Sequence, residues 1–234
     1  MKLSIVIPVF NEEKTVFQLI QEVKKVDLGK RITKEIIVID DGSEDNSSKI
    51  LARMGSINLI THKYNTGKGS AVQSGFKKAS GDIILIQDAD LEYDPRDYKK
   101  LIEPIVKTKC KVVYGTRLAK EAFRIFGKNK TPLPLHYLGN IFLTAFTNML
   151  YGSSLTDMET CYKVFSAEVI KPMKLKSKKF DIEPEITAKI LKQKINILEV
   201  PIKVKPRDYS EGKKITWKDG AIAVWTLVKY RFVN

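Results

Sequence analysis

The chain has 234 residues and a formal net charge of +14, and its hydrophobic content of 43% is ample for a buried core. No apolar stretch approaches the ~20 residues that a helix needs to cross a bilayer, and the first residues predict a strand, not a signal peptide. Cys110 and Cys161 lack metal-ligand spacing and indicate reduced thiols in a cytosolic chain. The basic excess is +4 in residues 1–117 and +10 in residues 118–234, so an anionic partner is expected at the second half.

The first half alternates apolar strands with helices. Strands are expected at 2–10, 34–41, 57–62, 81–90 and 111–117. Helices are expected at 12–26, from about 43 to 55, at 71–79 and at 95–107, with Asn11 capping the first and Ser43 or Asp45 the second. Because strands that are apolar throughout are covered on both faces, this half predicts an α/β fold with a Rossmann-like, mostly parallel sheet flanked by helices.

After Arg117 the pattern changes. Residues 118–137 are basic and aromatic and are interrupted by Pro and Gly, which predicts a loop or a short amphipathic segment. Helices are expected at 139–151, 182–193 and 217–231, with a strand at 195–205 and a loop at 206–215. We therefore expect a single domain over residues 1–234 with a C-terminal elaboration.

Acidic and polar side chains follow three of the predicted strands. The stretch "DIILIQDADLEYDP" places Asp88 and Asp90 directly after a buried strand, and "DDGS" (40–43) follows another. In open parallel sheets ligands bind beyond the carboxyl ends of the strands, and carboxylates that cluster there need a positive partner. Mg²⁺ is usually held by one or two carboxylates and by substrate phosphates. A D-x-D triplet alone is common in caps and turns, but its place after the strand favours a divalent cation with a nucleoside diphosphate.

The loop "KYNTGKGSA" (63–71) has two glycines flanking Lys68. It matches neither the P-loop nor the G-x-G-x-x-G pattern. Two interpretations remain open: a turn between a strand and a helix, or a contact between Lys68 and the nucleotide.

Several motifs in order resemble those of a known family. "SIVIPVFNEE", "IIVIDDGSEDNS", "NTGKGSAVQSGFKKASGDIILIQDADLEYDP" and "VYGTR" are similar to the successive motifs of family 2 glycosyltransferases of GT-A fold. "TDMETCYKVF", "FDIEPEITAKIL", "EVPIKV" and "RDYSEGKKITWKDG" resemble the subgroup of polyprenyl- and dolichyl-phosphate sugar synthases. The resemblance covers essentially the whole chain.

The resemblance implies functional residues. The nucleotide-sugar site would be lined by Pro8, Phe10, Asn11, Glu12, Asp40, Asp41, Gly42, Ser43, Lys68, Asp88, Ala89 and Asp90. Mg²⁺ or Mn²⁺ would be held by Asp88, Asp90 and Glu92. The acceptor phosphate would be bound by Arg117 and by a second basic residue, a role for which Arg124, Lys128, Lys130 and His136 compete. Arg207 and Lys213 or Lys214 would fold over the donor diphosphate or the acceptor phosphate. Residues 1–117 would then bind the nucleotide sugar, and residues 118–234 would face the acceptor and the membrane.

The expected reaction is transfer of a hexose to a polyprenyl or dolichyl phosphate with inversion. A bound cation stabilises charge on the leaving diphosphate, and an anionic acceptor needs no strong general base. If the acceptor is instead a hydroxyl of a glycan or protein, Asp157 and Glu159 are the candidate bases. Asp157 could also cap a following helix. The sequence leaves the donor open between GDP-mannose and UDP-glucose types.

A lipid acceptor requires a membrane surface. Residues 118–151 mix basic and aromatic side chains, which is typical of interfacial segments. We expect a peripheral protein at the cytoplasmic face of the membrane, with recruitment by a membrane protein as a further option. The last helix carries Trp217, Trp225 and Tyr230 and could lie at the same interface, although packing in the core is the stronger expectation.

The high pI of about 9.6 also raises nucleic acid as a partner. The basic residues do not gather on one recognition helix, no nucleic-acid-binding motif is present, and a carboxylate cluster repels phosphates. The sequence therefore predicts no nucleic acid partner.

Overall fold

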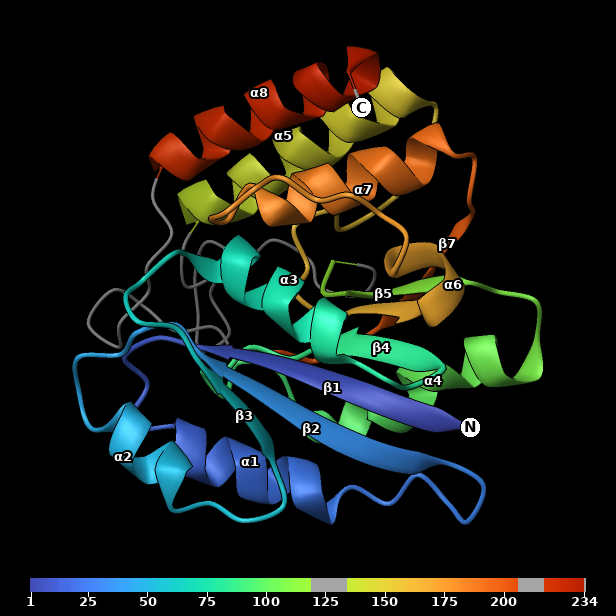
Figure 1. The fold of residues 1–234 in the computed structure, drawn as a ribbon. Coiled ribbons are helices and arrows are strands. Elements are labelled where there is room, and N and C mark those ends of the chain that lie inside the picture. Colours follow the sequence, from blue (N-terminus) through green and yellow to red (C-terminus); the bar gives the residue numbers. More distant parts are fainter. Residues whose placement is uncertain (119–133, 206–216, 234) are drawn as a thin grey trace.

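The structure is a computed structural model that describes residues 1–118, 134–205 and 217–233 (Figure 1). A seven-stranded sheet lies at its centre. In chain order the strands are β1 (Lys2–Val9), β2 (Thr33–Asp40), β3 (Asn58–Thr61), β4 (Ile83–Ile86), β5 (Val112–Thr116), β6 (Lys163–Ser166) and β7 (Ile197–Pro201). Their spatial order is β3-β2-β1-β4-β6-β5-β7.

All neighbouring pairs are parallel except those made by β6, which runs antiparallel to both β4 and β5. The sequence analysis predicted the mostly parallel sheet correctly but assigned no strand to residues 163–166. This strand has four residues and opens on Lys163, so its apolar run is too short to stand out. Its direction matters for the site, because an antiparallel strand begins at the edge where its parallel neighbours end.

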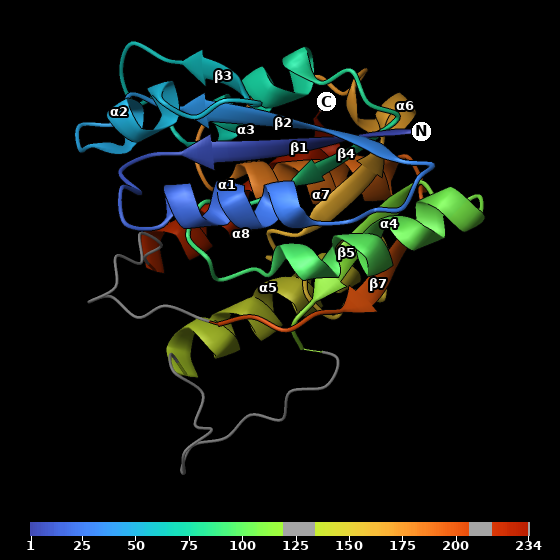
Figure 2. The same ribbon diagram turned by 90° about the horizontal axis from the view of Figure 1, so that it is seen from below.

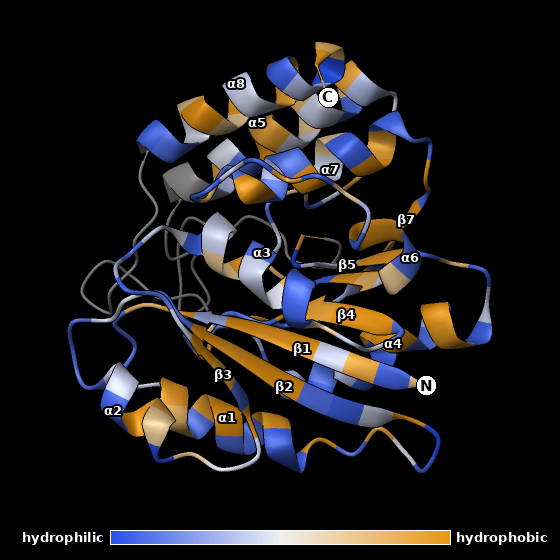
Figure 3. Cartoon of the chain, in the orientation of Figure 1, coloured by the Kyte–Doolittle hydropathy of each residue, from blue (hydrophilic) through white to orange (hydrophobic). Residues whose placement is uncertain are grey.

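Helices cover both faces of the sheet. The helices are α1 (Val16–Lys25), α2 (Ser47–Ala52), α3 (Lys68–Lys78), α4 (Tyr98–Lys107), α5 (Pro134–Tyr151), α6 (Ala167–Ile170), α7 (Ile182–Lys192) and α8 (Trp217–Phe232), with a 3₁₀ turn η1 (Pro95–Asp97) before α4. Residues of α1, α2 and α4 share one core cluster with one face of the sheet, and residues of α3, α6 and α7 share a second cluster with the other. α5 and α8 pack outside α7 as a third layer around Leu143, Ala188 and Leu227 (Figures 1 and 3).

The predicted starts of α1 and α5 differ from the structure, whereas one predicted capping residue does contribute to the start of α2. α1 begins at Val16, and Asn11 does not cap it: Asn11 has a φ of 52°, and its Oδ1 accepts a hydrogen bond from Glu44 N at 2.8 Å. Asp45 does serve the start of α2, since its Oδ1 accepts from Ser47 N at 2.8 Å. α5 begins at Pro134, because proline is favoured at the first position of a helix, where its missing N–H has no partner to lose.

Within the described part of the chain, we find no helix with the length and apolar character needed to span a bilayer.

α3 lies close against the sheet because of a glycine. A Cβ at Gly75 would lie 2.2 Å from Val6 Cγ1 and 2.9 Å from Ile39 Cδ1, both of which are buried side chains of the central strands. The same helix delivers Lys68 at its first position. Gly75 therefore sets the distance at which α3, and with it Lys68, is held over the sheet.

We predict that Gly75→Ala lowers the free energy of unfolding by about 1–3 kcal/mol, since the added methyl overpacks the interface with β1 and β2. Gly220→Ala on α8 is the matched control: nothing lies within 4 Å of its added Cβ, so alanine's better helix propensity should stabilise the protein by up to about 1 kcal/mol. Urea unfolding of both variants checks the opposite signs. Equal effects in both would contradict the close packing of α3.

Candidate active site

The loops that follow β1 and β2 are joined at the carboxyl edge of the sheet (Figure 2). Asn11 N donates to Ser43 Oγ at 3.1 Å, and Glu12 N donates to Ser47 Oγ at 2.9 Å. Pro8, half-buried at the end of β1, pairs with Ile39. The structure thus brings together the two segments that the sequence assigned to one nucleoside pocket.

Asp40 and Asp41 are both buried, and both have partners within the chain. Asp40 accepts hydrogen bonds from Ser43 N at 3.0 Å and from the hydroxyl of Ser48. Its contact with a base or ribose stays a prediction.

Asp41 holds the glycine loop in place. Its carboxylate accepts from Thr66 Oγ1 at 2.6 Å and from Gly67 N at 2.7 Å, and His62 Nδ1 lies 2.6 Å from Oδ1. Gly42 has a φ of 70°, and a Cβ there would lie 2.5 Å from the Tyr64 carbonyl carbon, so this close approach requires glycine. Asp41 therefore shapes the wall of the site by fixing residues 62–67.

The glycines beside Lys68 are explained by packing. A Cβ at Gly67 would lie 2.4 Å from the carbonyl oxygen of Lys178, and one at Gly69 would lie 2.4 Å from that of Ser177. The loop is thus pressed against the segment that leads into α7. This position is what directs Lys68 into the site.

Lys68 pairs with the first carboxylate of the D-x-D triplet. Its Nζ lies 2.8 Å from Asp88 Oδ1, 3.2 Å from Glu183 Oε1 and 3.4 Å from Cys161 Sγ. Burial alone would raise the pKa of Asp88, but Lys68 holds that pKa below its usual range. Lys68 therefore compensates the charge of Asp88 within the chain, and binding of a metal ion by Asp88 stays a prediction.

Asp90 and Glu92 lie on the turn after Asp88. Asp90 Oδ1 accepts from Glu92 N at 3.1 Å, and the intervening Leu91 has a φ of 64°. Among the residues described, no three His, Cys, Asp or Glu side chains gather in a way that could hold a metal ion. Two carboxylates with a diphosphate do fit Mg²⁺, so the residues suit a cation that arrives with phosphate oxygens. Ligation by Asp88, Asp90 and Glu92 stays a prediction.

A second charged pair joins the end of β5 to residues 156–160. Arg117 Nε donates to Asp157 Oδ2 and Nη2 to Oδ1, each at 2.7 Å, and Asn140 Nδ2 of α5 donates to Oδ1 at 2.9 Å. Asp157 is fully buried, whereas the Arg117 side chain is 23% exposed. Burial would raise the pKa of Asp157, but Arg117 keeps it below the ordinary value. Asp157 is thus a fixed anion that orients Arg117.

The sequence analysis missed two residues of this region, Lys163 and Glu183. Lys163 is fully buried, and its Nζ lies 2.7 Å from Glu183 Oε2. The available signal was a charge inside an apolar element: Lys163 opens the strand "KVF", and Glu183 lies in the buried first turn of α7. Neighbouring Glu159 has a buried Oε1 without a hydrogen-bond partner in the described chain, and burial raises the pKa of its carboxyl to about 7.

Several predicted acceptor residues lie outside the described residues: Arg124, Lys128, Lys130, Arg207, Lys213 and Lys214. The side chain of His136 is also not described. Their contacts with a phosphate remain predictions.

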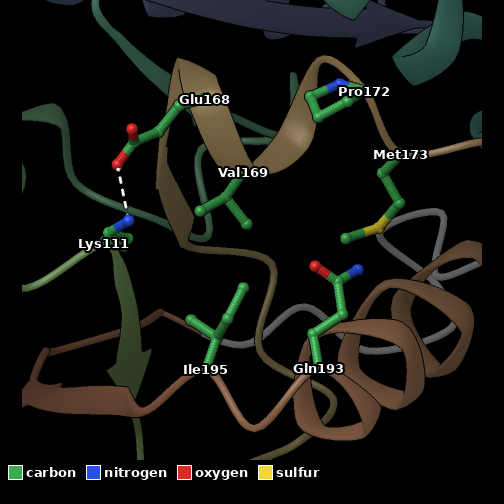
Figure 4. Close-up of a pocket in the computed structure, with 7 residues that line it drawn as sticks. All are labelled: Lys111, Glu168, Val169, Pro172, Met173, Gln193 and Ile195. Carbon is green, nitrogen blue, oxygen red and sulfur yellow. Dashed lines mark ion pairs between the residues drawn. The ribbon is translucent and has the colours of Figure 1, made fainter.

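A surface pocket lies away from these residues (Figure 4). Its lining includes Lys111, Glu168, Met173, Gln193 and Ile195, and Lys111 Nζ pairs with Glu168 Oε1 at 3.1 Å. Lys111 precedes β5 and Ile195 precedes β7, so the pocket is at the amino edge of these strands, opposite the edge that carries Asp88 and Arg117. It contains none of the predicted site residues.

Comparison with known proteins gives the family. The sequence model of "Glycosyl transferase family 2" matches residues 4–172. A UDP-N-acetylglucosamine–dolichyl-phosphate N-acetylglucosaminyltransferase from Methanococcus voltae is 30% identical over 89% of this chain and 88% of its own. The hexosyltransferase Agl6 of low-salt glycan biosynthesis from Haloferax volcanii is 31% identical over 99% of this chain and 53% of its own. A dolichol-phosphate mannosyltransferase from Pyrococcus furiosus is 35% identical over 51% of this chain and 34% of its own.

Solved structures give the fold. Glucosyl-3-phosphoglycerate synthase from Mycobacterium tuberculosis, crystallised with Mn²⁺ and UDP-glucose, matches 100% of this chain and 80% of its own with a TM-score of 0.75 and 18% identity. The same enzyme crystallised with Mg²⁺ and UDP matches with a TM-score of 0.73 and 18% identity, over 100% of this chain and 80% of its own. The architecture is the GT-A fold predicted from the sequence, and the chain belongs to glycosyl transferase family 2.

Proposed function

We propose that the protein transfers a hexose from a nucleotide sugar to a polyprenyl or dolichyl phosphate, with inversion at the anomeric carbon. The observation that carries the proposal is the pair Arg117–Asp157 beside α5: a fixed, partly exposed guanidinium lies next to a helix whose outer face is apolar. A lipid phosphate has these two parts, an anionic head and a hydrocarbon tail. The named relatives support this class of acceptor.

The donor would lie along residues 1–117. The segments 8–12 and 40–43 would hold the nucleoside, and Asp88 and Asp90 would bind Mg²⁺ or Mn²⁺ with the diphosphate. The bound cation would act as a Lewis acid toward the leaving diphosphate. Lys68 lies beside Asp88 and can donate to a phosphate oxygen.

The acceptor would lie on the side of residues 118–234. Arg117 would bind the lipid phosphate and direct one of its oxygens at the anomeric carbon. The C–O bond to the nucleoside diphosphate breaks as the new C–O bond forms, so a single displacement inverts the centre. Because the phosphate is already anionic, the step needs alignment more than a base. Asp157 fits this scheme as the partner that orients Arg117.

α5 and α8 form the layer outside α7 (Figure 3), and the exposed side chains of these two helices support a membrane partner. α5 carries no Asp, Glu, Lys or Arg between Pro134 and Tyr151. Its exposed side shows Leu138, Ile141, Phe142 and Met149, and that of α8 shows Ile222, Trp225 and Phe232 beside Lys218 and Lys229. Exposed apolar side chains bordered by basic ones suit the surface of an anionic bilayer. We place the protein peripherally at the cytoplasmic face of the membrane, with a membrane protein as a second candidate partner.

The sequence left two expectations for the last helix, a position at the membrane interface and packing in the core. Trp225 and Tyr230 differ in this respect. Tyr230 is buried and packs in the third core cluster, whereas the Trp225 side chain is 67% exposed. α8 is thus a core-packed helix that still presents an apolar outer face.

Transfer to a hydroxyl is the second candidate function. Asp157 is a weak candidate base there, since Arg117 holds its pKa low. Glu159 is the better candidate base, because burial raises its pKa to about 7 and its Oε1 has no hydrogen-bond partner among the described residues, and both features suit proton acceptance. Two results together would favour this function: the wild type uses glycan acceptors and not lipid phosphates, and Glu159→Gln loses all transfer.

The test of the proposal is incubation with a short polyprenyl phosphate, Mg²⁺ and a panel of UDP- and GDP-sugars, with detection of the glycosylated lipid by mass spectrometry. We expect one donor class to give product, and Asp90→Ala to reduce turnover at least 10²-fold because the diphosphate loses charge compensation. Asp27→Ala, which removes an exposed acid from the loop after α1, should leave turnover unchanged. Wild-type rates in Asp90→Ala would refute the metal assignment.

Arg117→Lys is expected to raise the KM for the lipid phosphate and to lower kcat/KM about 10²-fold, with the donor KM unchanged. A lysine keeps the charge but loses the planar fork that pairs with Asp157 and a phosphate at once. Steady-state kinetics with each substrate varied checks this split. Arg53→Lys, at an exposed position, is the control. A change confined to the donor KM would contradict the assignment of Arg117 to acceptor binding.

The double variant Phe142→Gln/Trp225→Gln should weaken binding to vesicles of anionic phospholipid at least tenfold, since each side chain contributes about 1 kcal/mol or more of apolar transfer. Phe17→Gln removes a comparably exposed aromatic from α1, on the other face of the sheet, and should have no effect. Vesicle sedimentation measures both. Equal loss in the two variants would mean that no specific face meets the lipid.

A further inference from the structure

Four charges, two of them buried and two partly buried, form a chain of alternating sign between the two halves of the candidate site. Asp88 pairs with Lys68 at 2.8 Å, Lys68 lies 3.2 Å from Glu183, and Glu183 lies 2.7 Å from Lys163. The Glu183 and Lys163 side chains are 4% and 0% exposed. These residues come from four segments: the turn after β4, the start of α3, the start of α7 and the start of β6.

The chain continues into the backbone that carries the acceptor-side pair. Lys163 Nζ donates to the carbonyl oxygen of Met158 at 3.0 Å and to that of Thr160 at 2.5 Å. Met158 directly follows Asp157, which holds Arg117. An unbroken series of contacts therefore connects the predicted donor carboxylate with the predicted acceptor guanidinium.

A contribution to stability does not by itself explain this series of four charges. Desolvating two opposite charges costs about as much as their attraction returns, and apolar side chains of similar size usually fill such a space at least as well. Glu183 is also held by charge alone: neither of its oxygens accepts a hydrogen bond of ordinary geometry from the described residues. Its carboxylate can thus shift between the ammonium groups of Lys68 and Lys163 when either one changes partner.

We infer that Glu183 and Lys163 are positioning residues that couple donor binding to acceptor binding. This inference rests on the proposed function for the identity of the two ligands. When a diphosphate and its cation bind at Asp88 and Asp90, Lys68 gains a new anion and its hold on Glu183 weakens. Glu183 then pairs more fully with Lys163. The hydrogen bonds from Lys163 to the carbonyl oxygens of Met158 and Thr160 in turn set the position of Asp157, and with it that of Arg117.

The test measures coupling between ligands and does not depend on turnover. The dissociation constant of farnesyl phosphate is determined by calorimetry with and without saturating nucleoside diphosphate and Mg²⁺, using the base that wild type accepts. We expect the two constants to differ by about fivefold or more in wild type, with the same factor for the nucleotide when the lipid phosphate is bound first. In Glu183→Gln the factor should fall below twofold.

Glu185→Gln is the matched control, since Glu185 is an equally buried acid on the same turn of α7. It is bound to Lys189 Nζ and to the backbone N–H groups of Lys176 and Ser177, outside the chain of charges. This variant should lose stability and keep the wild-type coupling factor. The contrast separates a positioning role from a merely structural one.

The double variant Lys163→Met/Glu183→Leu is the control for a misfolded Glu183→Gln. It removes one charge of each sign, leaves the Asp88–Lys68 pair intact and is expected to fold, since no buried charge is left unpaired. Its coupling factor should also fall below twofold. A well-folded double variant with wild-type coupling would overturn the inference, as would a wild type that binds both ligands independently. A wild type that binds neither ligand would instead overturn the proposed function.

Discussion

Three carboxylates at the carboxyl edge of the sheet, those of Asp41, Asp88 and Asp157, are stable because each has a positive or donating partner within the chain. Asp41 is bound by Thr66 and Gly67, Asp88 pairs with Lys68, and Asp157 pairs with Arg117. Every one of these partners is distant in sequence, so each contact ties one loop of the site to another element. The charges thus organise the site before any ligand binds, which is the condition for electrostatic preorganisation.

The topology explains how so many charged groups meet at one edge. β1, β2 and β4 end there because they are parallel, and β6 begins there because it is antiparallel. Residues 157–162 are therefore delivered to the same edge as Asp88, although they precede a strand instead of following one. α7 adds Glu183 from its first turn, and the outer layer of α5 and α8 packs on α7 and supplies Asn140.

Much of the fold follows from the sequence, because the first five strands are apolar runs separated by helical periodicity. β6 does not, since four residues opening on a lysine carry too little pattern. That the candidate site residues would gather at this edge was also predictable from strand direction. The partners of its carboxylates were not: Lys68 and Asp88 are 20 residues apart, and Arg117 and Asp157 are 40 residues apart. Only packing reveals that a lysine lies 2.8 Å from the first carboxylate of the predicted metal site.

The two sides of α5 have different surroundings. The side of α5 that carries Asn140 holds the Asp157 carboxylate, while Phe142 and Met149 on its outer side are exposed. If that outer side meets lipid as proposed, a small tilt of the helix on docking is transmitted to the Arg117 guanidinium through the Asn140–Asp157 hydrogen bond and the Asp157–Arg117 ion pair. The enzyme would then show surface-dilution kinetics, working poorly on monomeric acceptor in bulk water and responding to the mole fraction of acceptor in the bilayer.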